Sequence, residues 1–253
     1  MIEDPYFYAI ALPAILLVGL SKGGFGGALA MLGVPMMTLV IPPVQAAAIL
    51  LPILIVMDIV GLLSYRKIYD RQSLINLIPP ALLGILAGWA MASLVSDAMV
   101  RLIVGLIAVS FTLRYWLQTA ERRKTPARHS RPWGILWGTI AGFTSFVSHA
   151  GGPPYQMYTL PLRMDPRLFA GTAVIFFAVV NSVKLIPYFA LGQFSADNLL
   201  TSLVLMPLAP IATLIGVWAV NVINPEKFYS LTYSLLFLIG LKLIWDAGTT
   251  GFL

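Results

Sequence analysis

Cysteine is absent from this 253-residue sequence, and charged residues are scarce. Without cysteine there is no disulfide framework, no thiolate metal site and no cysteine nucleophile, and the sequence does not indicate a redox compartment. Only 10% of the residues are Asp, Glu, Lys or Arg, against about 25% in a typical soluble domain. Because so few charges cannot cover a water-facing surface, a soluble globular domain is excluded.

Apolar residues take the place of the missing charges. They make up 59% of the chain, and the mean hydropathy is +0.88, which also excludes intrinsic disorder. The net charge of +6 and the pI near 9.7 would suggest a nucleic-acid partner in a soluble protein. Here the excess Lys and Arg lie mostly between apolar runs, where membrane topology explains them. We therefore expect a lipid bilayer around the chain and no nucleic acid.

Ten apolar runs predict an all-α polytopic membrane protein. A crossing helix needs about 20 apolar residues, and six of the runs are long enough. The runs are 6–20, 26–41, 45–64, 73–95, 99–118, 133–147, 153–162, 167–190, 197–221 and 228–246. Prolines inside these runs predict kinks; they are Pro52, Pro79, Pro80, Pro207 and Pro210.

Two Gly-rich breaks join the four short runs in pairs. The first break, residues 21–27, reads Ser-Lys-Gly-Gly-Phe-Gly-Gly, and the second, residues 148–154, reads Ser-His-Ala-Gly-Gly-Pro-Pro. Glycine and proline at this density end helices. Each broken pair is expected to be either a re-entrant hairpin or two short spans.

A hydrophilic stretch, Gln118–Pro132, divides the chain near its middle. Features of the first part recur in the same order after it: a Gly-rich break, then a polar site (Asp58, matched by Asn181), then a proline and a terminal cation. This order indicates an internal repeat. We predict a first transmembrane repeat at 1–118, a basic cytoplasmic loop at 119–132 and a second repeat at 133–253.

Orientation follows from Lys and Arg in the short loops, which favour the cytoplasmic side. The basic turns at 64–72, 119–132 and 163–167 are expected inside. The turns at 96–97 and 191–196, which contain no Lys or Arg, are expected outside. Each half, a broken pair plus three long helices, then crosses an odd number of times. We therefore expect both termini outside and repeats of inverted topology, which is typical of secondary transporters that bind substrate between the repeats near mid-membrane.

A cation lies in the first break and a potential cation at the matching position in the second. Lys22 is surrounded by glycines whose N–H groups have no side-chain cover, and His149 is its counterpart. Exposed N–H groups, a helix N-terminus and a cation together form an anion site. We expect a small anionic substrate to be bound by Ser21, Lys22, Gly23, Gly24, Gly26, Ser148, His149, Gly151 and Gly152. The alternative is that the glycines only allow close helix packing.

Asp58 is the one acidic residue deep inside an apolar run. A charge at mid-bilayer costs at least about 2.5–3.5 kcal/mol, so such a residue is a functional candidate. Asp58 is interpreted as a proton carrier, a sodium ligand, a partner for a buried lysine, or a helix–helix hydrogen-bonding group. Lys184 either reaches the headgroups or lies at the mouth of a pathway. We assign Asp58, Asn181 and Lys184 to coupling or to the transport pathway.

The remaining ionisable residues have simpler interpretations. Arg101, Arg114 and Lys242 lie near the ends of their runs and are expected to reach lipid headgroups. His129 lies in the hydrophilic loop and is expected to be inert. The chain offers neither the nucleophile–base pair nor the metal cluster that a membrane enzyme needs. We therefore expect no catalysis, no metal and no cofactor.

The two breaks resemble those of the TauE/SafE family, the so-called sulfite exporters. The resemblance is carried by Gly-Leu-Ser-Lys-Gly-Gly-Phe-Gly-Gly at 19–27 and by Gly-Phe-Thr-Ser at 142–145 followed by the second break, and it spans about residues 8–246. It implies a multi-pass transporter of the bacterial inner membrane, built from two related halves, for sulfite, sulfonates and related organosulfur or carboxylate anions. The family's first break often reads Gly-Ile-Gly-Gly-Gly, from which Lys22 and Phe25 depart.

These observations together predict a secondary transporter of a small sulfur-containing oxyanion, such as sulfite or a sulfonate, that works by alternating access. Coupling to protons or sodium ions and assembly as a homodimer are further expectations. The alternatives are an anion channel with the same lining and a carrier for another small, carboxylate-type anion.

Overall fold

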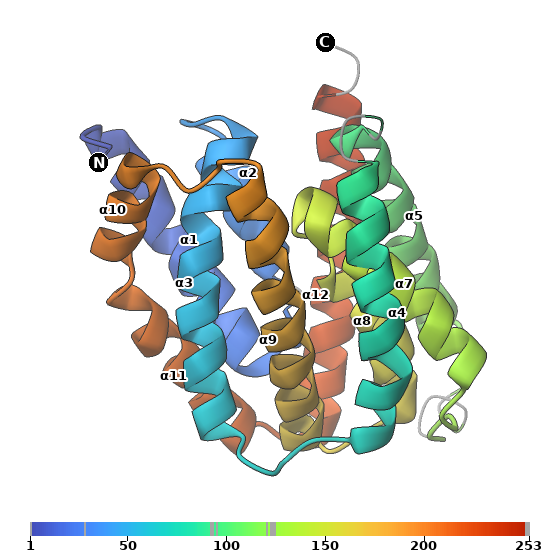
Figure 1. Ribbon diagram of the computed structural model, residues 1–253. Helices are drawn as coiled ribbons and strands as arrows, with labels where there is room; N and C mark the ends of the chain where they lie inside the picture. The colour runs from blue at the N-terminus through green and yellow to red at the C-terminus, as the bar shows by residue number, and fades with distance from the viewer. Residues whose placement is uncertain are drawn as a thin grey trace.

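The computed structural model describes residues 2–27, 29–91, 94, 96–119, 121 and 125–250, but not the side chains of Asp97 and Thr250. Within these ranges the chain is helical and has no strand, which confirms the predicted all-α fold. The helices form one bundle, and α1 (Pro5–Gly24) begins at the end of the bundle where α12 (Pro225–Thr250) finishes (Figure 1). Residues 122–124, the centre of the predicted basic loop, lie outside the described residues.

Six of the described helices are long and apolar enough to cross a bilayer. They are α1, α3 (Pro43–Ser64), α4 (Arg71–Ala90), α5 (Asp97–Trp116), α9 (Pro166–Ala190) and α12. The predicted run 197–221 forms a bent pair, α10 (Ala196–Leu205) and α11 (Leu208–Val222), whose axes differ by 47°. The break falls at the predicted kink, Pro207, because proline has no N–H to continue the helix ladder.

Three of the long helices, α1, α4 and α9, begin at an aspartate whose side chain accepts a hydrogen bond from a backbone N–H of the first turn. Asp4 accepts a hydrogen bond from the N–H of Tyr6 at the start of α1, and Asp70 accepts one from Ser73 in α4. Asp165 caps α9 in the same way and is followed by Pro166, whose fixed φ suits a first helical turn. The few Asp residues of the chain thus set several helix starts at the loops.

Each Gly-rich break separates a long helix from a short return limb. After α1 the chain turns into a 3₁₀-helix, η1 (Leu29–Leu32), and α2 (Gly33–Met37). After α7 (Arg131–Ser148) it turns into α8 (Gly152–Thr159) and a second 3₁₀-helix, η2 (Leu160–Leu162). Neither return limb approaches the roughly 20 residues of a crossing helix. This length favours the re-entrant hairpin over two short spans.

Glycines let pairs of helices from the two halves of the chain approach closely. α1 packs on α11, α4 on α7, α5 on α12 and α3 on α9. A Cβ at Gly142 of α7 would lie 1.9 Å from the carbonyl oxygen of Ala81 in α4, and one at Gly23 of α1 would lie 2.1 Å from that of Thr213 in α11. The interpretation of glycine as a packing residue therefore holds at these contacts.

Candidate functional site

A buried ion pair joins the first break to the middle of the bundle. Lys22, near the end of α1, pairs through Nζ with Oδ1 of Asp58 in α3. Asn181 of α9 donates a hydrogen bond from Nδ2 to the other carboxylate oxygen, Oδ2, over 2.7 Å. Lys22 is 5% exposed and Asp58 is 3% exposed. Of the interpretations considered for Asp58, the structure therefore shows the partner of a buried lysine.

A second polar cluster lies around Lys184 of α9. Its Nζ donates to the carbonyl oxygen of Ser145 over 3.0 Å and to the Ser145 Oγ over 3.3 Å, and it lies 3.3 Å from Nδ1 of His149. His149 Nε2 is 2.9 Å from the hydroxyl of Tyr188. The imidazole of His149 thus bridges Lys184 and Tyr188. Lys184 is fully buried, so it does not reach the headgroups.

A small cavity of about 20 Å³ lies between the two clusters. Polar side chains from α1, α7, α9 and the second break line it, together with Phe177 and the apolar start of the first return limb. Its lining residues are Lys22, Gly27, Ala30, Leu54, Ser145, His149, Gly152, Phe177, Asn181 and Lys184. This volume holds about one water molecule, so a larger ligand requires the helices around it to separate.

The first break is held by side chains from two other segments of the chain. Gly26 and Gly27 have φ values of +62° and +74°, which glycine adopts without steric cost. Gln156 of α8 donates from Nε2 to the carbonyl oxygen of Phe25 over 2.9 Å. Tyr65, directly after α3, donates to the carbonyl oxygen of Gly23 over 2.5 Å. These bonds fix the position of Lys22 relative to α3 and α8.

The second break turns at His149, whose φ is +53°. A non-glycine residue in this region costs on the order of 1 kcal/mol or more, and such strain is concentrated at functional sites. Thr144 stabilises the turn, since its carbonyl oxygen accepts from the N–H of Ala150 over 3.0 Å and its hydroxyl donates to the carbonyl oxygen of Ala150 over 3.0 Å. The strained turn directs the imidazole toward Lys184 and Tyr188.

The structure places the predicted binding residues in different surroundings. Lys22, His149 and Gly152 line the cavity with two of the predicted pathway residues, Asn181 and Lys184. Gly26 and Gly151 lie in the two breaks beside it but do not line it. The hydroxyl of Ser148 donates to the carbonyl oxygen of Thr144 over 3.4 Å.

Three expected ligands of the first break differ from the prediction. α1 continues through Gly24, so Gly23 and Gly24 lie inside a helix, where backbone N–H groups serve the helix ladder. Both glycines face α11. The hydroxyl of Ser21 accepts a hydrogen bond from the N–H of Leu29 over 2.9 Å and so caps η1.

Ser145 and Phe177 are site residues that the residue-by-residue reasoning did not single out. Ser145 belongs to the Gly-Phe-Thr-Ser stretch at 142–145, where its polarity beside the second break was the available signal. Phe177 lies with its ring centroid 5.6 Å from Lys22 Nζ. Since α9 contains several phenylalanines, the sequence gives no signal that this one contacts Lys22.

Two cations expected to reach the headgroups have a partner instead. Asp246 of α12 lies 2.6 Å from Nζ of Lys242 and 4.0 Å from a guanidinium nitrogen of Arg101 in α5. Arg101 is 7% exposed. This cluster ties α5 to α12 and lies apart from the cavity, which contains none of the three residues.

The charge balance at the cavity favours an anion. Two lysines and one aspartate meet there, and Lys184 has no carboxylate within ion-pair distance among the described residues. Charges in a low-dielectric interior interact much more strongly than in water. A single negative charge in the cavity would therefore balance the ammonium of Lys184.

Comparison with known proteins agrees with this chemistry. The family model described as "Sulfite exporter TauE/SafE" matches residues 11–243, nearly the whole chain. No curated protein and no solved structure matches the chain.

Proposed function

We propose that this chain, which belongs to the sulfite exporter TauE/SafE family, is a secondary transporter that carries a small sulfur-containing oxyanion across the bacterial inner membrane by alternating access. Membership of the family supports membrane transport of sulfur anions and fits the expectation that the chain is not an enzyme. The observation that carries the proposal is Lys184, which is fully buried beside the cavity and has no carboxylate within ion-pair distance in the part of the chain that the structure describes.

The donors around the cavity suit an oxyanion. Lys184 Nζ, Ser145 Oγ and Asn181 Nδ2 all carry hydrogens, and Gly152 at the first turn of α8 adds a backbone N–H. The sulfite dianion and a sulfonate head group present several hydrogen-bond acceptor oxygens and no hydrogen-bond donor. Charge-assisted hydrogen bonds of this kind are about twice as strong as neutral ones.

Asp58 acts as an internal counterion in this proposal. In the empty site it neutralises Lys22, which avoids the cost of an unpaired buried charge during reorientation. When the substrate anion takes over Lys22, the buried carboxylate loses its cation and needs a proton or a sodium ion. This exchange provides a physical route to coupling at Asp58.

Alternating access requires the cavity to open to each side in turn. The first helix of each half carries site residues and packs against a helix of the other half. α1 packs on α11, and α7 packs on α4. This arrangement supports inverted repeats that rock against each other around a central site. We place the basic loop in the cytoplasm and both termini outside.

Transport by purified protein in proteoliposomes tests the proposal. Wild-type protein should take up radiolabelled sulfite, and Lys184→Met should remove most of that uptake. Lys242→Met serves as the matched control, because this lysine lies in the Asp246 cluster and should leave uptake unchanged. Uptake by Lys184→Met at the wild-type rate would refute the site.

Counterflow separates the carrier from the alternative of an anion channel. A carrier preloaded with unlabelled sulfite shows accelerated uptake of labelled sulfite, whereas a channel does not. Competition by sulfite, methanesulfonate and acetate then separates a sulfur oxyanion from a carboxylate-type substrate.

A further inference from the structure

A second, larger pocket lies at the end of the bundle where α5 finishes and α7 begins. Its volume is about 530 Å³, and α5, α7, α8, α12 and the segment 125–130 surround it. Three arginines line it, Arg114, Arg128 and Arg163, and its described lining residues include no carboxylate. A pocket of this size accommodates a ligand of several hundred cubic ångströms. The positive charge of its arginines favours an anionic ligand.

The arginines are placed to meet an anion at the pocket wall. Arg163 donates to the hydroxyl of Tyr115 over 2.8 Å, and its guanidinium carbon lies 4.4 Å from the centroid of the Tyr229 ring, so its planar head is fixed. Arg114 and Arg128 are exposed, and neither forms an ion pair with a carboxylate of the described residues. Arginine binds phosphate through two parallel hydrogen bonds.

The rest of the pocket surface is mainly apolar and aromatic, and the pocket adjoins the outer face of α5. Trp133 and Trp137 stack with centroids 6.2 Å apart and form part of the wall. Arg114 and Gln118 also border a neighbouring hollow that Leu113 and Leu117 line. These leucines are 43% and 86% exposed, as expected for side chains in contact with lipid.

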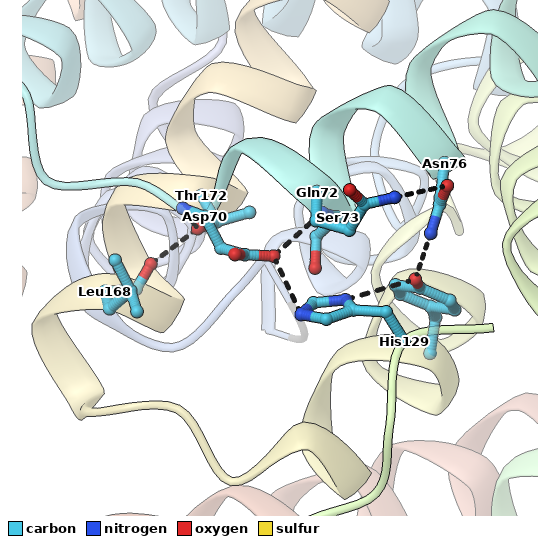
Figure 2. A network of polar contacts seen from close by, with 8 residues as sticks. Asp70, Gln72, Ser73, Asn76, His129, Leu168 and Thr172 are labelled. Atoms are coloured by element: carbon cyan, nitrogen blue, oxygen red, sulfur yellow. Dashed lines mark hydrogen bonds and ion pairs between the residues drawn. The ribbon is translucent and has the colours of Figure 1, made fainter. Parts of the chain in front are cut away.

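The wall beside the 125–130 segment is anchored by a polar network (Figure 2). His129 lies between Asp70, with Nε2 and Oδ2 3.6 Å apart, and the hydroxyl of Tyr158, 3.5 Å from Nδ1. Asn76 donates to the same hydroxyl over 2.7 Å. His129, expected to be inert, therefore helps to hold one side of the pocket against α4 and α8.

We propose that this pocket binds the head group of an anionic phospholipid. Arg114, Arg128 and Arg163 hold the phosphate, and the acyl chains lie over Leu113 and Leu117. The helix ends that form the pocket are those of predicted runs 99–118 and 133–147, so it lies at head-group depth. Basic pockets between membrane helices bind anionic head groups, whereas a free anion would leave the exposed side chains of Leu113 and Leu117 uncovered.

Thermal unfolding of the full-length protein in detergent tests the proposal. Short-chain phosphatidylglycerol should raise the melting temperature more than phosphatidylcholine of the same chain length. The variant Arg114→Gln/Arg128→Gln should lose this difference, since each arginine removed should weaken binding by about tenfold. The matched control Arg66→Gln/Arg71→Gln removes two exposed charges from another turn at the same end and should keep it.

The same melting-temperature measurement with glycerol phosphate and with inorganic phosphate distinguishes a lipid head group from a soluble anion. Neither should reproduce the effect of phosphatidylglycerol. Equal stabilisation by inorganic phosphate would overturn the lipid assignment in favour of a soluble anion, and an unchanged lipid effect in the double variant would overturn the pocket. If the double variant does not fold, Arg128→Gln, outside any helix, provides the same comparison.

Discussion

Asn181 donates a hydrogen bond to Asp58 across 123 residues of chain, over 2.7 Å and at less than 4% exposure of either residue. The two residues occupy matching positions in the predicted repeat, one in α3 and one in α9, which pack against each other. Their contact joins α3 to α9 directly beside the ion pair of Asp58 with Lys22 of α1, so one buried carboxylate links three helices.

Asp58→Asn should destabilise the protein strongly. It leaves Lys22 buried without a counterion, and removing one partner of a buried ion pair costs about 3–5 kcal/mol. Thermal unfolding in detergent measures the effect. The double variant Asp58→Asn/Lys22→Met should recover most of the loss, and a double variant as unstable as the single one would contradict the ion-pair interpretation.

Lys184→Met should have opposite effects on stability and on binding. It removes a buried charge that has no carboxylate within ion-pair distance among the described residues, so the empty protein should be at least as stable as wild type. Stabilisation by added sulfite should fall at least about tenfold in apparent affinity. A variant that unfolds earlier yet binds sulfite normally would show that Lys184 is structural.

Gly142→Ala should destabilise the contact between α4 and α7. The new Cβ would lie 1.9 Å from a backbone oxygen, and overpacking of this kind costs about 1–3 kcal/mol. Gly248→Ala in α12 is the matched control, because nothing lies within 4 Å of its Cβ position and alanine favours a helix. Melting temperatures of the two variants should therefore move in opposite directions or differ by several degrees.

Asp70 combines a helix cap with the contact to His129, and two substitutions separate these roles. Asp70→Ala removes both and should cost about 1–2 kcal/mol. Asp70→Asn keeps a capping oxygen and loses only the charge facing His129, which at a partly exposed site contributes less than about 1 kcal/mol. Equal losses in the two variants would show that the cap contributes nothing.

Hydropathy alone predicted most of the helices, because a bilayer requires long apolar segments whose backbone groups are all bonded internally. The predicted runs 45–64, 167–190 and 228–246 coincide closely with α3, α9 and α12. The same reasoning singled out Lys22, Asp58 and Lys184, since a charge inside an apolar run costs too much to be incidental. Family membership was likewise evident from the two Gly-rich breaks.

Partners and orientations depended on the tertiary structure. Gly23 and Gly24 read as part of a break, yet they pack α1 against α11, because glycine serves a turn and a close helix contact equally well. Asp246 neutralises Arg101 only because α5 lies beside α12. The sequence by itself determined which residues are buried charges. The packing of α1, α3, α7 and α9 decided that Lys22 pairs with Asp58 while Lys184 bonds to Ser145 beside the same cavity, since contacts between distant segments leave no local pattern in the chain.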